Sequence, residues 1–97
     1  MRNLIDSIRA ERDAIIRAAA DHGVTNVRIF GSAARGNARP DSDIDVLVDL
    51  EPGRNLFDLG GFLMDVQDIV GRRVHVVTEG SVHWYVRDRI LQEAQPL

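Results

Sequence analysis

With 97 residues, the chain is long enough for one hydrophobic core and too short for two, so we expect a single domain over residues 1–97. Any domain for substrate recognition is then expected to come from another protein. The composition, 44% hydrophobic and 28% charged with a net charge of −3, predicts a soluble globular protein without a transmembrane segment. The charged N-terminus predicts no signal segment, and the absence of cysteine is compatible with the cytoplasm, where we expect the protein to act. The absence of cysteine and lysine excludes disulfides, thiolate or lysine nucleophiles and the lysine-dependent phosphate loop. The mild acidity argues against direct binding of nucleic acid by its phosphates.

Apolar periodicity predicts alternating helices and strands along the chain. Their order is helix 4–19, strand 24–30, short helix 33–35, strand 43–50, helix 56–70, strand 72–78 and helix 82–94. Between the short helix and the second strand, the residues of "GNARPDS" are typical of a loop. This alternation predicts an α+β domain of α/β type, with a small mixed sheet of at least three strands and helices packed on it.

Two aspartates stand close together at the start of the second expected strand. Side chains two positions apart on a strand point to the same face, so Asp43 and Asp45 project together. Their repulsion is relieved by a hard divalent cation such as Mg²⁺, which takes oxygen ligands from carboxylates and from substrate phosphates. The pair therefore predicts half of a metal site whose other half is a nucleotide. Asp49 shares this face but lies about 13 Å from Asp45 along the strand, so we expect a solvated strand end there.

A Gly-Ser pair follows the first expected strand directly. Gly31 lets backbone N–H groups approach an anion, the Ser32 hydroxyl adds a donor, and the helical turn that follows favours negative charge at its start. If the first two strands are neighbours, the connection over residues 33–42 brings this turn beside the carboxylates, with Arg35 and Arg39 available to neutralise phosphate oxygens. Either motif alone is common in turns and strand ends, but together they predict a site for a triphosphate tail.

The order of these motifs resembles a known superfamily. An apolar residue, Gly31-Ser32, ten residues and then Asp-apolar-Asp-apolar is similar to the nucleotidyltransferases related to DNA polymerase beta. Within that superfamily the chain resembles the minimal nucleotidyltransferases, which are stand-alone domains of about this size. The likeness extends over nearly the whole chain, through "FGSAARGNARPDSDIDVLV", "GRRVHVVTEG" and "RDRILQEA".

This resemblance implies the nucleotidyltransferase fold and its chemistry. In that chemistry paired metal ions, Mg²⁺ or Mn²⁺, are held by carboxylates and bind a nucleoside triphosphate. A nucleoside monophosphate passes to an acceptor hydroxyl with loss of pyrophosphate. On the matching positions, Gly31 and Ser32 hold phosphates, and Asp43 and Asp45 ligate metal.

One position departs from the family pattern. The family usually carries a third acid on the following strand, and the matching residue in "GRRVHVVTEG" is His75. A neutral imidazole offers one nitrogen lone pair and no negative charge, and it suits Mn²⁺ or Zn²⁺ better than Mg²⁺. Three interpretations stay open: His75 is a general base, a substitute metal ligand, or the mark of a weak or inactive enzyme.

The resemblance also implies a partner. Minimal nucleotidyltransferases are commonly paired in bacteria and archaea with a helical toxin of the HEPN class, an RNase, and are held to act as its antitoxin by adenylylating a tyrosine. The chain is then expected to use ATP and to transfer AMP to a partner toxin. A second interpretation, motivated by His75, is an antitoxin with weakened catalysis that neutralises its partner by binding. A third is a regulatory nucleotide-binding module.

Overall fold

The protein is built on a four-stranded mixed sheet. The computed structural model describes residues 4–39 and 41–97, so residues 1–3 and Pro40, which belongs to the predicted loop, lie outside the described part. The strands are β1 (Val24–Phe30), β2 (Ile44–Leu50), β3 (Val74–Thr78) and β4 (Gln95–Pro96), in the order β3-β2-β1-β4. Strand β2 is antiparallel to β1 and parallel to β3, and β4 is antiparallel to β1. The sheet agrees with the predicted fold class, and β4 is a strand that the sequence pattern did not reveal.

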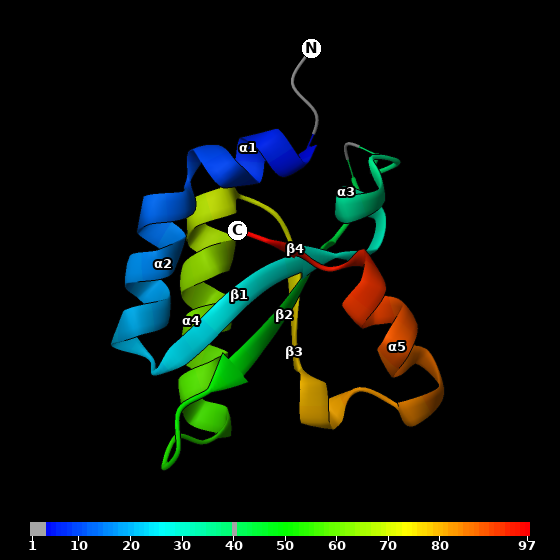
Figure 1. Cartoon of the computed structure of the whole chain (residues 1–97). Helices are drawn as coiled ribbons and strands as arrows, with labels where there is room; N and C mark the ends of the chain where they lie inside the picture. The colour runs from blue at the N-terminus through cyan, green and yellow to red at the C-terminus, as the bar shows by residue number, and fades with distance from the viewer. Residues whose placement is uncertain (1–3, 40) are drawn as a thin grey trace.

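Helices lie on both sides of this sheet (Figure 1). Their bounds are α1 (Leu4–Ala10), α2 (Arg12–Asp21), α3 (Gly31–Arg35), α4 (Leu56–Val70), the 3₁₀ turn η1 (Glu79–Ser81) and α5 (Trp84–Glu93). Helices α2 and α4 lie side by side on one side of the sheet, and α5 lies on the other (Figure 1). Helix α3 is a short connection that turns the chain from the end of β1 toward β2.

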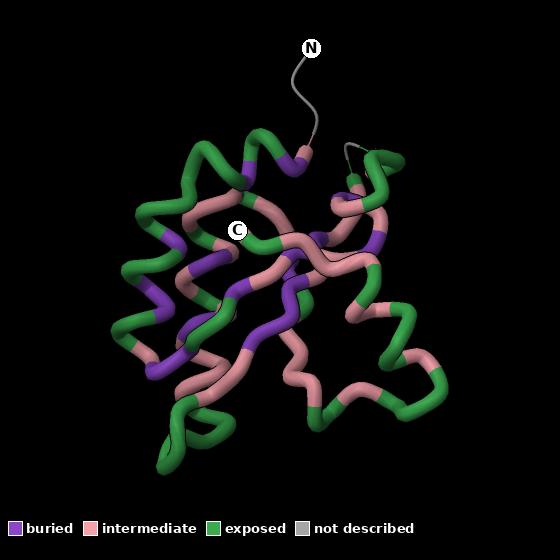
Figure 2. Tube along the Cα trace, viewed as in Figure 1, coloured by how far each residue is buried: buried purple, intermediate pink, exposed green. Residues whose placement is uncertain are grey.

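The hydrophobic core lies between the sheet and helices α1, α2 and α4. On β2, Ile44, Val46 and Val48 belong to this core, so the residues between them project from the opposite face. Figure 2 shows the buried residues on the strands and on the inner sides of these helices, whereas α5 has no buried residue. The alternation along β2 therefore places Asp45 on the face away from the core.

The helix predicted over residues 4–19 is interrupted at Glu11, so the prediction of one continuous helix was wrong. Glu11 has φ −100° and ψ 16°, and it separates α1 from α2. The bend brings Leu4 and Ile8 of α1 to a pocket that Ile44 and Ile69 also line, at the end of the core. Local periodicity is the same for straight and bent helices, so only this packing reveals the break.

Helix α4 has the predicted bounds because both of its ends carry strong local signals. The Asn55 Oδ1 accepts a hydrogen bond from the Phe57 N–H at 2.9 Å, and Asp58 accepts one from the Asn55 N–H at 3.0 Å. Gly71 ends the helix with φ 68°. Helix α5 starts two residues later than predicted because η1 precedes it. None of the helices in the described residues is long and apolar enough to cross a membrane.

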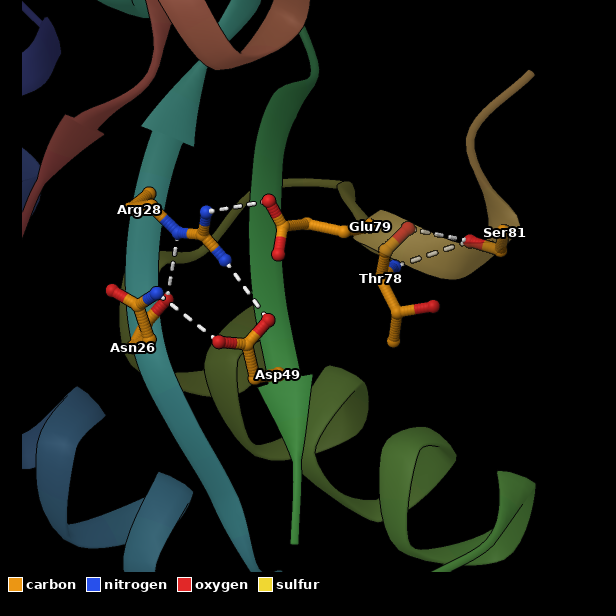
Figure 3. Close-up of polar contacts among 6 residues, drawn as sticks. All are labelled: Asn26, Arg28, Asp49, Thr78, Glu79 and Ser81. Atoms are coloured by element: carbon orange, nitrogen blue, oxygen red, sulfur yellow. Dashed lines mark hydrogen bonds and ion pairs between the residues drawn. The ribbon is translucent and has the colours of Figure 1, made fainter. Parts of the chain in front are cut away.

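A polar network joins β1 and the end of β2 to η1 (Figure 3). The Arg28 guanidinium, whose side chain is only 11% exposed, lies 3.2 Å from Asp49 Oδ1 and 3.7 Å from Glu79 Oε1. Asn26 has φ 51° at a register shift in β1, and its amide donates to Asp49 at 3.1 Å. Asp49 is therefore a bonded member of this network and not the solvated strand end that the sequence suggested.

Replacing Arg28 tests how much this network stabilises the sheet. Arg28→Met keeps much of the side-chain length and leaves Asp49 and Glu79 without their cation, so we expect the free energy of unfolding to fall by about 1–2 kcal/mol in urea denaturation. Arg12→Met is the control, because it removes an exposed pair with Asp13 at 3.8 Å and should change the free energy by less than about 0.5 kcal/mol. Equal losses in both variants would contradict the stabilising role of Arg28.

Candidate active site

Two aspartates and a histidine meet where β2 and β3 begin. Asp43 comes directly before β2, Asp45 is its second residue, and Asp45 pairs in register with His75 of β3. The His75 Nε2 lies 2.8 Å from Asp43 Oδ2, close enough for a hydrogen bond or an ion pair. The parallel pairing of β2 with β3 therefore brings together all three residues that the sequence assigned to catalysis.

The Asp45 carboxyl lies in a partly buried and crowded electrostatic environment. Burial raises the pKa of Asp45 above its usual value, and the charge of His75 opposes that increase. Asp43 and Glu93 raise the pKa further, whereas Arg35 lowers it. The raised pKa of Asp45 is therefore due mainly to burial, and a bound cation would favour the ionised carboxylate.

Gly31 brings the anion-binding turn directly against Asp45. It is buried, has φ 72° and begins α3, and a Cβ at this position would overlap the Asp45 carboxylate. Only glycine accommodates both the left-handed backbone and this close approach. Ser32, the next residue, is half-buried, and its hydroxyl makes no hydrogen bond with any other described residue. The predicted phosphate-binding pair therefore lies beside one of the predicted metal ligands.

The two arginines that are predicted to neutralise phosphate oxygens, Arg35 and Arg39, differ in their surroundings. Arg35, at the end of α3, donates from Nη1 to Glu93 Oε1 at 2.9 Å, and its charge acts on Asp45. Arg39 is exposed, and its guanidinium makes no hydrogen bond or ion pair with the rest of the described chain. Arg35 therefore belongs to the group around Asp45, whereas the contact of Arg39 with phosphate stays a prediction.

Glu93 also belongs to the group around Asp45, although its position was not predicted from the sequence. Its Oε2 accepts a hydrogen bond from the Gly31 N–H at 3.3 Å, and its side chain is 17% exposed. Burial alone would raise the pKa of Glu93, but the hydrogen bond and charge of Arg35, with help from Gly31 and Arg89, outweigh it and lower the pKa. Glu93 is thus an ionised carboxylate held at the entrance of α3. Glu93 is 62 residues away from Gly31 in the sequence, so no local sequence pattern could indicate this contact.

Arg72, for which we predicted no role, holds the loop before β2 in place. Its Nη1 donates to the carbonyl oxygens of Ser42 at 3.1 Å and of Arg39 at 3.4 Å. An open pocket beside this contact is lined by Asp41, Ser42, Asp43, Gly71, Arg72 and Arg73. Asp43 therefore borders an open pocket on the side of Arg72 and Arg73.

The carboxylate pair suits a hard cation, although it does not form a complete cage. Within residues 4–39 and 41–97, no group of three or more acidic or histidine side chains is arranged to hold a metal ion. Mg²⁺ is commonly bound by one or two carboxylates together with substrate phosphates, and it keeps several waters. Asp43 and Asp45, two carboxylates at the start of β2, therefore fit an ion that the substrate helps to bind.

The sequence and the fold both match known proteins. The family model described as "Nucleotidyltransferase domain" matches residues 12–97. A relative from Methanocaldococcus jannaschii named "Putative protein adenylyltransferase MJ0435" is 41% identical over 80 residues, which cover 82% of this chain and 86% of that protein. The solved "Structure of putative minimal nucleotidyltransferase" is 42% identical, with a TM-score of 0.86 over 99% of this chain and 97% of the other.

A more distant structure extends the likeness in fold. A toxin–antitoxin crystal structure with AMP-PNP has a chain with a TM-score of 0.72 to this protein, 17% identity, and coverage of 87% of this chain and 69% of that chain. At this identity the likeness concerns the fold alone. The fold is thus that of a nucleotidyltransferase, as predicted. The chain belongs to the nucleotidyltransferase domain family, among its minimal nucleotidyltransferases.

Replacing Gly31 tests how tightly the turn and the carboxylate fit together. Gly31→Ala places a methyl group against the Asp45 carboxylate and strains a left-handed residue, so we expect the free energy of unfolding to fall by about 2–4 kcal/mol. Gly36→Ala is the matched control, because Gly36 has φ 78° but open space around it, and should cost only about 1–2 kcal/mol. Equal losses would show that backbone strain alone accounts for the effect.

Proposed function

We propose that this nucleotidyltransferase transfers AMP from ATP to a hydroxyl group of a partner protein. The observation that supports this most is the position of Asp45, which lies against Gly31 and in register with His75. A glycine turn, a carboxylate pair and a cationic side chain at one end of a sheet are suited to a metal-bound polyphosphate. The name of the M. jannaschii relative, a protein adenylyltransferase, supports a protein as the acceptor.

In this proposal the polyphosphate lies across the start of α3. The Gly31 N–H and the Ser32 hydroxyl donate to phosphate oxygens, and Arg35 and Arg39 neutralise their charge. Asp43 and Asp45 hold Mg²⁺ or Mn²⁺ together with the phosphates. When bound, the metal neutralises the charge that develops on the phosphate oxygens and the leaving group.

The acceptor approaches the α-phosphorus of ATP. Its hydroxyl oxygen forms the new bond to phosphorus, the bond to the bridging oxygen of pyrophosphate breaks, and the hydroxyl proton passes to a base or to solvent. His75 is the imidazole within reach of this region, as a base or as a metal ligand. The pocket lined by Asp43 and Arg73 offers an entry route for the acceptor side chain.

We further propose that the acceptor is a tyrosine of a HEPN-type toxin and that the protein acts in the cytoplasm as its antitoxin. The fold that this chain shares with a protein from a toxin–antitoxin complex with AMP-PNP supports the proposal.

Removing one carboxylate tests the transfer. With ATP, Mg²⁺ or Mn²⁺ and the partner, we expect the partner to gain the mass of AMP, and Asp45→Asn to reduce the rate by about a hundredfold or more. Intact-protein mass spectrometry of the partner measures the product. Asp49→Asn removes the same charge from the same strand at a distance and should retain most of the activity. Undiminished transfer by Asp45→Asn would refute the metal-binding role.

A second function is favoured by the contact of His75 with Asp43. An imidazole nitrogen 2.8 Å from Asp43 Oδ2 engages one oxygen of the proposed metal-binding pair. In this alternative, catalysis is weakened and the protein neutralises its partner by covering it. Binding of the partner would then be sufficient, and the nucleotide would not be needed.

Replacing His75 separates the two functions. His75→Asp supplies a third carboxylate at the position paired with Asp45, so we expect at least about a tenfold gain in AMP transfer if catalysis has decayed at this site. A comparable loss is expected if the imidazole itself serves as base or ligand. Initial rates of partner adenylylation measure the change, and unchanged partner binding in both proteins shows that the surface is intact.

A further inference from the structure

The Glu93 carboxylate is bound by Gly31 and Arg35, the groups that are proposed above to bind the phosphates of the nucleotide. Its two oxygens accept hydrogen bonds from the Gly31 N–H at 3.3 Å and from Arg35 at 2.9 Å. Carboxylate and phosphate oxygens have the same requirement for such donors, because both are anionic acceptors that pair with guanidinium and backbone N–H groups. The protein therefore carries its own anion in this place.

Glu93 and a polyphosphate cannot both keep these bonds. The Gly31 N–H has one proton to donate, and Asp45 lies against the same glycine. Glu93 also acts electrostatically on Asp45, so a polyphosphate added beside both carboxylates would increase the repulsion among anions. Binding of the nucleotide at Gly31 therefore requires that Glu93 moves away.

The chain after α5 keeps Glu93 close to the site. Gln95 pairs with Ile29 in the sheet, and its side-chain amide donates to the Ala34 carbonyl oxygen of α3 at 2.9 Å. This attachment gives the Glu93 carboxylate a high effective concentration at Gly31. Because α5 has no buried residue, Glu93 can leave without opening the core, and Arg89, at 3.5 Å, remains as its partner in the same helix.

We propose that Glu93 sets the affinity of the nucleotide site, because its carboxylate occupies Gly31 and Arg35 in the unliganded protein and is exchanged for the polyphosphate when ATP binds. This inference rests on the proposed function and deepens it. If Glu93 occupies the site in part of the molecules, the apparent affinity for ATP falls in proportion to the fraction in which the site is free.

The opposite effect is expected if Glu93 only positions Arg35. In that case the ion pair at 2.9 Å orients the guanidinium for phosphate, and removal of the carboxylate weakens the binding of ATP. The sign of the change in affinity therefore separates a competing anion from a positioning residue.

Isothermal titration calorimetry of the full chain with ATP and Mg²⁺ tests the proposal. We expect Glu93→Gln to bind ATP about threefold to thirtyfold more tightly than the unmodified protein. Glu79→Gln is the matched control, because it removes the same charge from a glutamate paired with an arginine at the other end of this face, and it should change the affinity by less than about twofold. Equal or weaker binding by Glu93→Gln would overturn the inference.

A second variant and a second measurement test the proposal in case Glu93→Gln does not fold. Glu93→Asp keeps the charge but shortens the side chain, so we expect an intermediate gain in affinity, with thermal unfolding confirming that the variant is folded. In ¹⁵N–¹H spectra, the Gly31 amide should shift on removal of the Glu93 carboxylate and again on addition of ATP. If neither the unmodified protein nor any variant binds ATP, the proposed function fails, whereas ATP binding without a gain in the Glu93 variants overturns this inference alone.

Discussion

The alternation of side chains along β2 is the constraint on which the arrangement of the site depends. Ile44, Val46 and Val48 are buried in the core, so Asp45 must project from the opposite face. A slip of one residue would place carboxylates in the core and expose the apolar residues, at a large cost in free energy. The hydrophobic core thus determines the face of β2 from which Asp45 projects, although Asp45 itself is not part of the core.

Around Asp45, the protein gathers charges of both signs instead of a simple acidic cluster. Asp43 and Glu93 contribute negative charge, and Arg35 and His75 face them. Asp43 pairs with His75 and Arg35 with Glu93, so ion pairs between different elements join the groups around Asp45.

The elements that could be predicted are those with a local signal. Strand β1 and helix α4 match their predicted bounds because apolar spacing, Asn55 and Gly71 mark them in the sequence. The proximity of Gly31 to Asp45 followed from the order of strand, glycine turn and strand. By contrast, β4 is only two residues long, and its pairing with β1 depends on where α5 ends. The position of Glu93 also depends on where α5 ends. Neither β4 nor the contact of Glu93 with Gly31 could therefore be recognised from a local sequence pattern.

The register between β2 and β3 also bears on how this site can evolve. Because position 75 is fixed opposite Asp45 by backbone hydrogen bonds, any side chain placed there is presented to the carboxylate pair. Codons for histidine and aspartate differ only in their first base. One point mutation can therefore exchange an imidazole for an acid at this position without rebuilding the strand, and related lineages can move between the two chemistries on an unchanged scaffold.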